Sequence, residues 1–199
     1  MKTFIIISLV VFFILLATQV AISYTTENKT EQQQYRIISS EGAFEIRYYP
    51  EAVLASVSMN GSYGSSTGSG FQQLAGYIFG GNETEQKIAM TAPVRMQQNE
   101  NNFQMSFVMP ADIPMDSLPE PLNPGVAIHQ SQPVYTASIT FGGYTNEKII
   151  GQMQDKLSEI LAEKDIRHTG NFEVLGYNPP YQVVNRRNEV IVELVGYSE

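Results

Sequence analysis

The stretch Val134-Tyr-Thr-Ala-Ser-Ile-Thr-Phe141, followed by Gly142-Gly143 and a long amphipathic segment, decides the fold of this chain. Side chains alternate along its first part, which predicts a β-strand ending at the two glycines. Asn146 is a suitable N-cap, and apolar residues recur at the helical period over 149–161. This part of the chain therefore reads as a strand, a glycine turn and a helix that runs to Lys164.

The first half of the chain shows the same order, which indicates an internal duplication. The Gly- and Ser-rich stretch 61–70 predicts a loop, and the helical period predicts a helix over 71–78. Short alternating or apolar runs predict strands at 44–49, 53–59, 87–96, 103–109, 126–129, 172–177 and 189–195. Two βαββ units with leading strands predict an α+β protein, in which about eight antiparallel strands form a curled or closed sheet with two helices packed on it.

Composition excludes several classes of function. The chain has 199 residues, with 12 Lys and Arg against 20 Asp and Glu and a formal net charge of −8. Such an acidic chain is a poor partner for nucleic acid, whose phosphates attract clustered Lys and Arg. Cysteine is absent, which excludes disulfides, zinc–thiolate sites and Cys nucleophiles. The two histidines cannot form a three-His metal site.

The N-terminal residues 1–23 read as a secretory signal peptide. Lys2 precedes an apolar run over 4–17, and Ala21 and Ser23 are small residues at the positions that a signal peptidase inspects. We therefore predict cleavage after Ser23 and a secreted or periplasmic location. The alternative is an uncleaved membrane anchor over residues 4–22, which would make the membrane a partner.

The polar, aperiodic residues 24–34 predict a flexible tether, so that the folded domain spans residues 35–199. Three Asn-X-Ser/Thr patterns begin at Asn28, Asn60 and Asn82. They matter in a eukaryotic host, where they predict acceptors for N-linked glycans.

Seven short motifs follow one another over residues 35–195. They are Glu45-Ile-Arg-Tyr-Tyr-Pro50, Phe71-Gln-Gln-Leu-Ala-Gly-Tyr-Ile-Phe-Gly-Gly-Asn82, Lys87-Ile-Ala-Met-Thr-Ala-Pro-Val94, Phe107-Val-Met-Pro110, Phe141-Gly-Gly143, Gly176-Tyr-Asn-Pro-Pro180 and Arg186-Arg-Asn-Glu-Val190. Their order resembles that of the SOUL/haem-binding-protein family. The resemblance implies a distorted eight-stranded antiparallel barrel with two helices, built from two βαββ repeats. It also implies binding of haem or a related tetrapyrrole without catalysis.

The resemblance draws attention to Tyr48. Some family members carry a His between the Arg and the Tyr of the opening strand motif, and Tyr48 stands at that position here. A Tyr phenolate is a known ligand of haem iron, and the neighbouring Arg47 would favour the anion. The alternative is a strand tyrosine packed against Pro50.

Further residues are candidate haem contacts by their type. Met90 and Met96 share one side of the predicted strand 87–96, and His129 ends the strand 126–129. Thioethers and imidazoles both ligate haem iron. The alternative is that the methionines fill the core and that the histidine lies at the surface.

Lys87, Arg95 and Arg186 are cations that haem propionates would attract. Arg186 has an equally good structural interpretation, in which it pairs with Glu189 or with a loop carbonyl. Glu189 shares a face of its strand with Glu193, and such a face is either exposed to solvent or lines a cleft for a cationic ligand.

These patterns predict a binding protein, not an enzyme, whose ligand is a small planar hydrophobic molecule with haem as the first choice. A first alternative is a binding module for another small molecule in the cleft between the two repeats. A second is a hydrolase, because Gly64-Ser-Ser-Thr-Gly68 matches the G-x-S-x-G pattern with Ser66 as nucleophile. The βαββ order does not match the alternating β and α units of that class of hydrolase.

Overall fold

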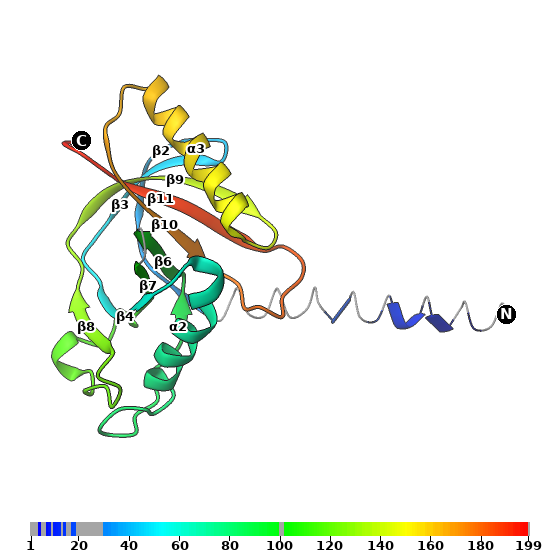
Figure 1. The fold of residues 1–199 in the computed structure, drawn as a ribbon, viewed down its shortest axis with the longest axis vertical. Coiled ribbons are helices and arrows are strands. Elements are labelled where there is room, and N and C mark those ends of the chain that lie inside the picture. The colour runs from blue at the N-terminus through cyan, green and yellow to red at the C-terminus, as the bar shows by residue number, and fades with distance from the viewer. Residues whose placement is uncertain are drawn as a thin grey trace.

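One large antiparallel sheet dominates the computed structural model, which describes residues 30–99 and 102–198 together with positions 4, 7, 8, 10–12, 14, 17 and 18 (Figure 1). From edge to edge its nine strands are β2 (Arg36–Glu41), β3 (Phe44–Tyr49), β9 (Val134–Gly142), β11 (Arg187–Leu194), β10 (His168–Gly176), β6 (Val94–Asn99), β7 (Asn102–Val108), β4 (Val53–Asn60) and β8 (Val126–Gln130). The remaining described elements of the domain are α2 (Tyr63–Ile78), η1 (Met115–Ser117), α3 (Glu147–Glu163) and the short parallel pair β1 (Glu31–Gln32) and β5 (Thr91–Ala92).

The strand order confirms the predicted α+β class and reflects the predicted duplication. The first repeat runs β4, α2, β6 and β7 along the chain, and its strands lie in the sheet in the order β6-β7-β4. The second repeat runs β9, α3, β10 and β11, and its strands lie in the corresponding order β10-β11-β9. The two repeats meet at β10 and β6, and each leading strand pairs with the opposite repeat, β3 with β9 and β8 with β4. Residues from both repeats therefore line the same curled surface.

The predicted eight-stranded barrel matches only in part, because the sheet has nine strands and is not closed. The additional strand is β2, which forms a hairpin with β3 around Gly42, a residue with φ of 64°. The sequence analysis missed β2 because most of its side chains are exposed and it lacks an apolar alternation. Among the described strands, β2 and β8 form the two free edges of the sheet.

Helix α2 begins eight residues before the predicted helix, so the prediction of a loop over 61–70 is largely wrong. Ser62 is the N-cap, and its backbone N–H donates to Ser65 Oγ at 3.1 Å. Glu147 of the second repeat accepts a hydrogen bond from the Gly64 N–H at 3.2 Å. Capping and tertiary contacts thus offset the low helix propensity of Gly and Ser. By contrast, the predicted N-cap Asn146 is confirmed, since its Oδ1 accepts from the Ile149 N–H at 3.0 Å.

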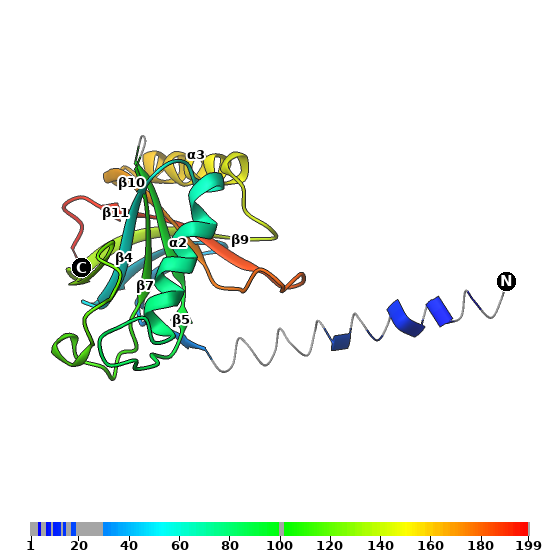
Figure 2. The same ribbon diagram turned by 60° about the horizontal axis from the view of Figure 1, so that its bottom comes forward.

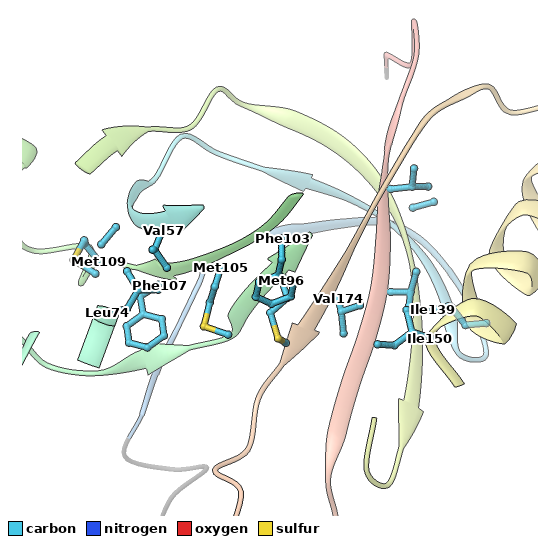
Figure 3. Packing of buried hydrophobic residues seen from close by; sticks show 14 of the residues in the cluster. Val57, Leu74, Met96, Phe103, Met105, Phe107, Met109, Ile139, Ile150 and Val174 are labelled. Carbon is cyan, nitrogen blue, oxygen red and sulfur yellow. The ribbon is translucent and has the colours of Figure 1, made fainter. Parts of the chain in front are cut away.

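The hydrophobic core lies between the helices and one face of the sheet. Figures 1 and 2 show both helices on the outside of the curl, where α2 contacts β4 and β7 and α3 contacts β9 and β11. Figure 3 shows Met96, Phe103, Met105 and Val174 pointing into this layer. Met96 is therefore a core residue, as the alternative interpretation of the methionines proposed.

Part of the predicted tether is packed against the domain. Glu31 and Gln32 pair with β5, the Gln33 N–H donates to the Ala92 carbonyl at 2.8 Å, and the Gln33 side chain is buried. Residues 24–29, and most of residues 1–23, lie outside the described residues, so the signal peptide and the alternative anchor stay predictions. Among the described residues, no helix has both the length and the apolar character of a membrane span.

Candidate functional site

The face of the sheet that turns away from the helices is polar. Cross-strand register places on it the side chains of Arg47, Ser56, Arg95, Ser106, His129, Thr136, Glu173, Glu189 and Glu193. Many of these side chains are buried. Because burying a polar group without a partner is costly, they must hydrogen-bond with one another or with a ligand.

A buried ion-pair network around Glu189 forms the centre of this face. Arg47, 1% exposed, donates to Glu189 from Nη1 to Oε2 at 2.6 Å and from Nη2 to Oε1 at 3.0 Å. Arg187 donates from Nη2 to Oε1 at 2.6 Å, and the Tyr177 hydroxyl donates to Oε2 at 2.9 Å. Glu189 itself is fully buried, so the solvent-exposed alternative is wrong for this residue, whereas Glu193 on the same face is exposed. Arg47 joins β3 to β11, which argues against its predicted contact with haem.

The network keeps its members in defined charge states. Burial opposes ionisation of Glu189, but the hydrogen bonds and charges of Arg47 and Arg187 outweigh it, and the pKa of Glu189 lies below its ordinary value. Burial, together with the charge of Glu189, raises the pKa of Tyr177. Burial also raises the pKa of Tyr49. Glu189 is therefore an anion and both phenols are neutral near pH 7.

A cleft of about 290 Å³ opens beside this network, and we call it the inner cleft. Its lining side chains include Leu54, Arg95, Gln97, Gln104, Ser106, His129, Val134, Thr136, Glu173, Ile191 and Glu193. Arg95 donates to Glu173 from Nε at 2.8 Å and from Nη2 at 2.9 Å, and its Nη1 donates to Gln33 Oε1 at 3.1 Å. Three predicted residues, Arg95, Met96 and His129, border this cleft, but Met96 packs in the core and the Arg95 guanidinium is already paired.

His129 and Thr136 add two different polar groups to the inner cleft. His129 Nε2 lies 2.8 Å from Ser56 Oγ, which in turn lies 2.7 Å from Ser106 Oγ. Thr136 is 2% exposed, and among the described residues its Oγ1 has no hydrogen-bond partner. Thr136 stands directly opposite Glu193 in the β9–β11 register. The alternation of residues 134–141 places Thr136 on the polar side of its strand but does not mark it as a site residue, whereas the shared face of Glu189 and Glu193 was visible.

Tyr48 lies on the opposite face of β3 from Arg47 and is half-buried. Its ring packs against Tyr135 at a centroid distance of 5.1 Å, and the Arg36 guanidinium lies 5.5 Å from its centroid. This packing favours the strand-tyrosine alternative, with Tyr135 as the ring partner.

Lys87 and Met90 are exposed in the segment before β5, so neither lies in the inner cleft.

Arg186 belongs to a third region, which we call the loop surface: Tyr144, Pro180, Tyr181, Val183 and Arg186. Its Nη1 donates to the carbonyls of Pro179 at 2.7 Å and Gln182 at 2.8 Å, which confirms the loop-carbonyl alternative. The same guanidinium lies 4.5 Å from the centroid of the Tyr144 ring. Exposed apolar groups therefore surround a partly buried cation.

Ser66 is buried in the first turns of α2, where its Oγ lies 3.5 Å from Ser65 Oγ. A catalytic triad would need a histidine, but among the described residues neither histidine bonds to Ser66. His129 Nε2 lies 2.8 Å from Ser56 Oγ, and His168 Nδ1 accepts a hydrogen bond from the Gly170 N–H at 3.2 Å. The described residues also contain no group of three or more His, Asp or Glu side chains placed to hold a metal ion. The described geometry therefore does not assemble the hydrolase site that the G-x-S-x-G pattern suggested.

Comparison with known proteins identifies the family. The model of the SOUL heme-binding protein family matches residues 30–193, which is the whole described domain up to β11. The chain belongs to the SOUL heme-binding protein family. It is 31% identical to human heme-binding protein 2 over 158 residues, covering 75% of this chain and 77% of the human protein. It is also 28% identical to heme-binding protein 1 of Xenopus tropicalis over 156 residues, or 74% and 82% of the two chains.

Solved structures show that the SOUL fold of this chain is shared more widely. The EcmrR C-terminal domain aligns with a TM-score of 0.61 at 7% identity, covering 82% of this chain and 99% of that domain. A hydrolase from Listeria innocua aligns with a TM-score of 0.56 at 10% identity, covering 79% and 94%. At such low identity these likenesses concern the fold alone.

The inner cleft of this SOUL domain does not fit haem. Haem combines a large apolar ring with two propionate carboxylates, whereas the cleft has a volume at the lower limit for drug-sized ligands and an excess of carboxylates. A wider groove of about 550 Å³ beside β1 carries Glu31, Glu51 and Asp116, and its described lining residues include no Lys or Arg. The loop surface fits better, because its apolar side chains are exposed and the sequence 177–187 contains no Asp or Glu.

Proposed function

We propose that this domain binds haem or a related tetrapyrrole outside the cytoplasm, as a non-catalytic binding, carrier or buffering protein. The observation that carries the proposal is the family match over residues 30–193, which spans both repeats. The relatives that match over three quarters of the chain are named heme-binding proteins. The signal-peptide pattern of residues 1–23 supports the location.

The loop surface is the region that we propose to hold the ligand. Tyr181, Val183 and Tyr144 are 60%, 57% and 52% exposed, so a planar ring can stack on them and remove apolar area from water. Arg186 brings a positive charge for a propionate beside them. Its Nε and the Oε1 of Gln182 are buried with no hydrogen-bond partner among the described residues, so the loop has unused polar capacity. Bound haem would supply its own iron chemistry, while these residues would hold and orient it.

A hemin titration of the purified protein, followed by the Soret absorption, tests this proposal. We expect saturable binding, and about ten- to a hundredfold weaker binding for Tyr181→Ser, because one large apolar side chain contributes roughly 1.5–3 kcal/mol. Phe79→Ser is the matched control, since Phe79 is 59% exposed at the far end of α2. It is expected to bind like the wild type.

Two further variants test the other predicted positions. Tyr48→Phe and His129→Ala are expected to leave the ferric spectrum unchanged if the ligand lies on the loop surface. A changed spectrum in Tyr48→Phe would instead indicate that the haem iron lies at the packed aromatic face of β3. The absence of saturable Soret change in the wild type would overturn the haem proposal altogether.

A further inference from the structure

We infer that the inner cleft binds a small organic cation, an ammonium group carried on an aryl or alkyl body. This inference goes beyond haem binding and does not rest on it. The inner cleft lies on the polar face of the sheet, whereas the loop surface lies on the β9–α3 and β10–β11 loops. The two sites also differ in charge.

The inner cleft has one more carboxylate than it has cationic side chains. Its lining holds two carboxylates, Glu173 and Glu193, and one guanidinium, Arg95, so these three side chains sum to a formal charge of −1. Arg95 is paired with Glu173 through two hydrogen bonds. Glu193 is exposed to solvent, and among the described residues it has no ion-pair partner. The carboxylate of Glu193 therefore gives the inner cleft a feature that favours a cation.

The unpartnered hydroxyl of Thr136 is the second, independent observation. Thr136 is almost completely buried, lines the inner cleft and has no hydrogen-bond partner among the described residues. It stands directly opposite Glu193 in the β9–β11 register, where Cβ atoms are roughly 4.5–5.5 Å apart. In the β3–β9 register it stands opposite Arg47, whose charge is already paired with Glu189. An ammonium group carries several N–H donors, so one group can donate to the Thr136 hydroxyl and to the Glu193 carboxylate together. Such a ligand would satisfy the hydroxyl that the fold leaves unpaired.

Apolar side chains specify the rest of the ligand. Leu54, Val134 and Ile191 line the same cleft, so an aryl or branched alkyl body has walls to pack against. The volume of about 290 Å³ limits that body to a small one. The bound molecule is therefore a small amphiphilic amine, not a metal ion or a macrocycle.

Isothermal titration calorimetry with 2-phenylethylammonium at pH 7 tests the inference. The neutral 2-phenylethanol and the anionic 3-phenylpropionate are the matched probes, because they keep the ring and change the charge. We expect saturable binding of the ammonium probe only. Glu193→Gln and the nearly isosteric Thr136→Val are each expected to weaken it about tenfold or more, since each loses a hydrogen bond to a charged group. Glu159→Gln is the control, because it makes the same chemical change at an exposed residue of α3, and it should bind the ammonium probe like the wild type.

The outcomes separate this inference from the haem proposal. Equal binding of the ammonium and alcohol probes, or unchanged affinity in Glu193→Gln with an unchanged melting temperature, would overturn it. Lack of any saturable binding of the ammonium probe would also overturn it. Hemin affinity is expected to be the same in Glu193→Gln and in the wild type. The hemin titration and the ammonium titration therefore test the two proposals independently.

Discussion

Replacing Glu189 by Gln removes one charge from the most buried ion-pair network of the described structure. The carboxylate accepts two hydrogen bonds from Arg47, two from Arg187 and one each from Tyr177 and Thr140. A carboxamide keeps only one oxygen and turns its NH₂ group toward these donors. The Arg47 guanidinium is then left buried with Glu45 as its remaining carboxylate partner.

The size of the effect follows from this burial. Breaking a fully buried pair by removing one partner costs about 3–5 kcal/mol, mostly because the other charge stays buried without compensation. Whole domains are stable by only about 5–15 kcal/mol. For a domain of this size each kcal/mol lowers the melting temperature by about 2–4 °C, so we expect a decrease of about 6–20 °C.

Thermal unfolding followed by circular dichroism measures this decrease, with Glu41→Gln as the matched control. Glu41 pairs with Lys164 through Oε2 at 2.8 Å, but its side chain is 65% exposed, and such surface pairs contribute only about 0–1 kcal/mol. If Glu189→Gln lowers the melting temperature no more than Glu41→Gln does, the assignment of Glu189 as the electrostatic centre of the sheet is refuted.

Glu189→Gln should also change how the stability of the folded state depends on pH. Because Arg47 and Arg187 outweigh burial and hold the pKa of Glu189 below its ordinary value, its ionised form stabilises the folded state. That contribution is complete above the unfolded pKa of about 4.3 and is lost as the pH falls through the lower folded pKa. Urea unfolding should therefore show a steeper loss of stability below about pH 4 in the wild type than in Glu189→Gln.

Two further predictions follow from individual backbone and side-chain environments. Gly68→Ala should raise the free energy of unfolding by about 0.5–1 kcal/mol, because a Cβ there has no neighbour within 4 Å in an exposed helical turn. Gly81→Ala should lower the free energy of unfolding by about 1–3 kcal/mol, because a Cβ would lie 2.6 Å from the Gly76 carbonyl oxygen. Urea titrations measure both changes, and equal effects of Gly68→Ala and Gly81→Ala would contradict this contrast. Expressed through a eukaryotic secretory pathway, the folded protein should carry a glycan on the exposed Asn60 and none on Asn82, which is 1% exposed and donates to the carbonyls of Tyr77 and Gln86. Peptide mass mapping checks this, and a glycan on Asn82 of folded protein would contradict it.

Local patterns were sufficient to predict most of the elements. The alternation of 44–49 and 53–59 and the stripe over 149–161 correspond to β3, β4 and α3, because the buried face of each element repeats at its own period. The first turns of α2 do not follow this rule. Their Gly and Ser residues favour a loop, and the helix forms there because Ser62, Ser65 and Glu147 cap it.

The sequence by itself determined the α+β class, the two βαββ repeats and the family, since each depends on short-range periodicity or on motif order. Only the tertiary structure decided what the candidate site residues do. Arg47 and Glu189 are separated by 142 positions in the chain and meet only because β3 and β11 both pair with β9. Thr136 and Glu193 become neighbours through the same register. A side chain's partner across a sheet depends on strand pairing, and strand pairing minimises the free energy of the whole chain, so no local pattern contains it.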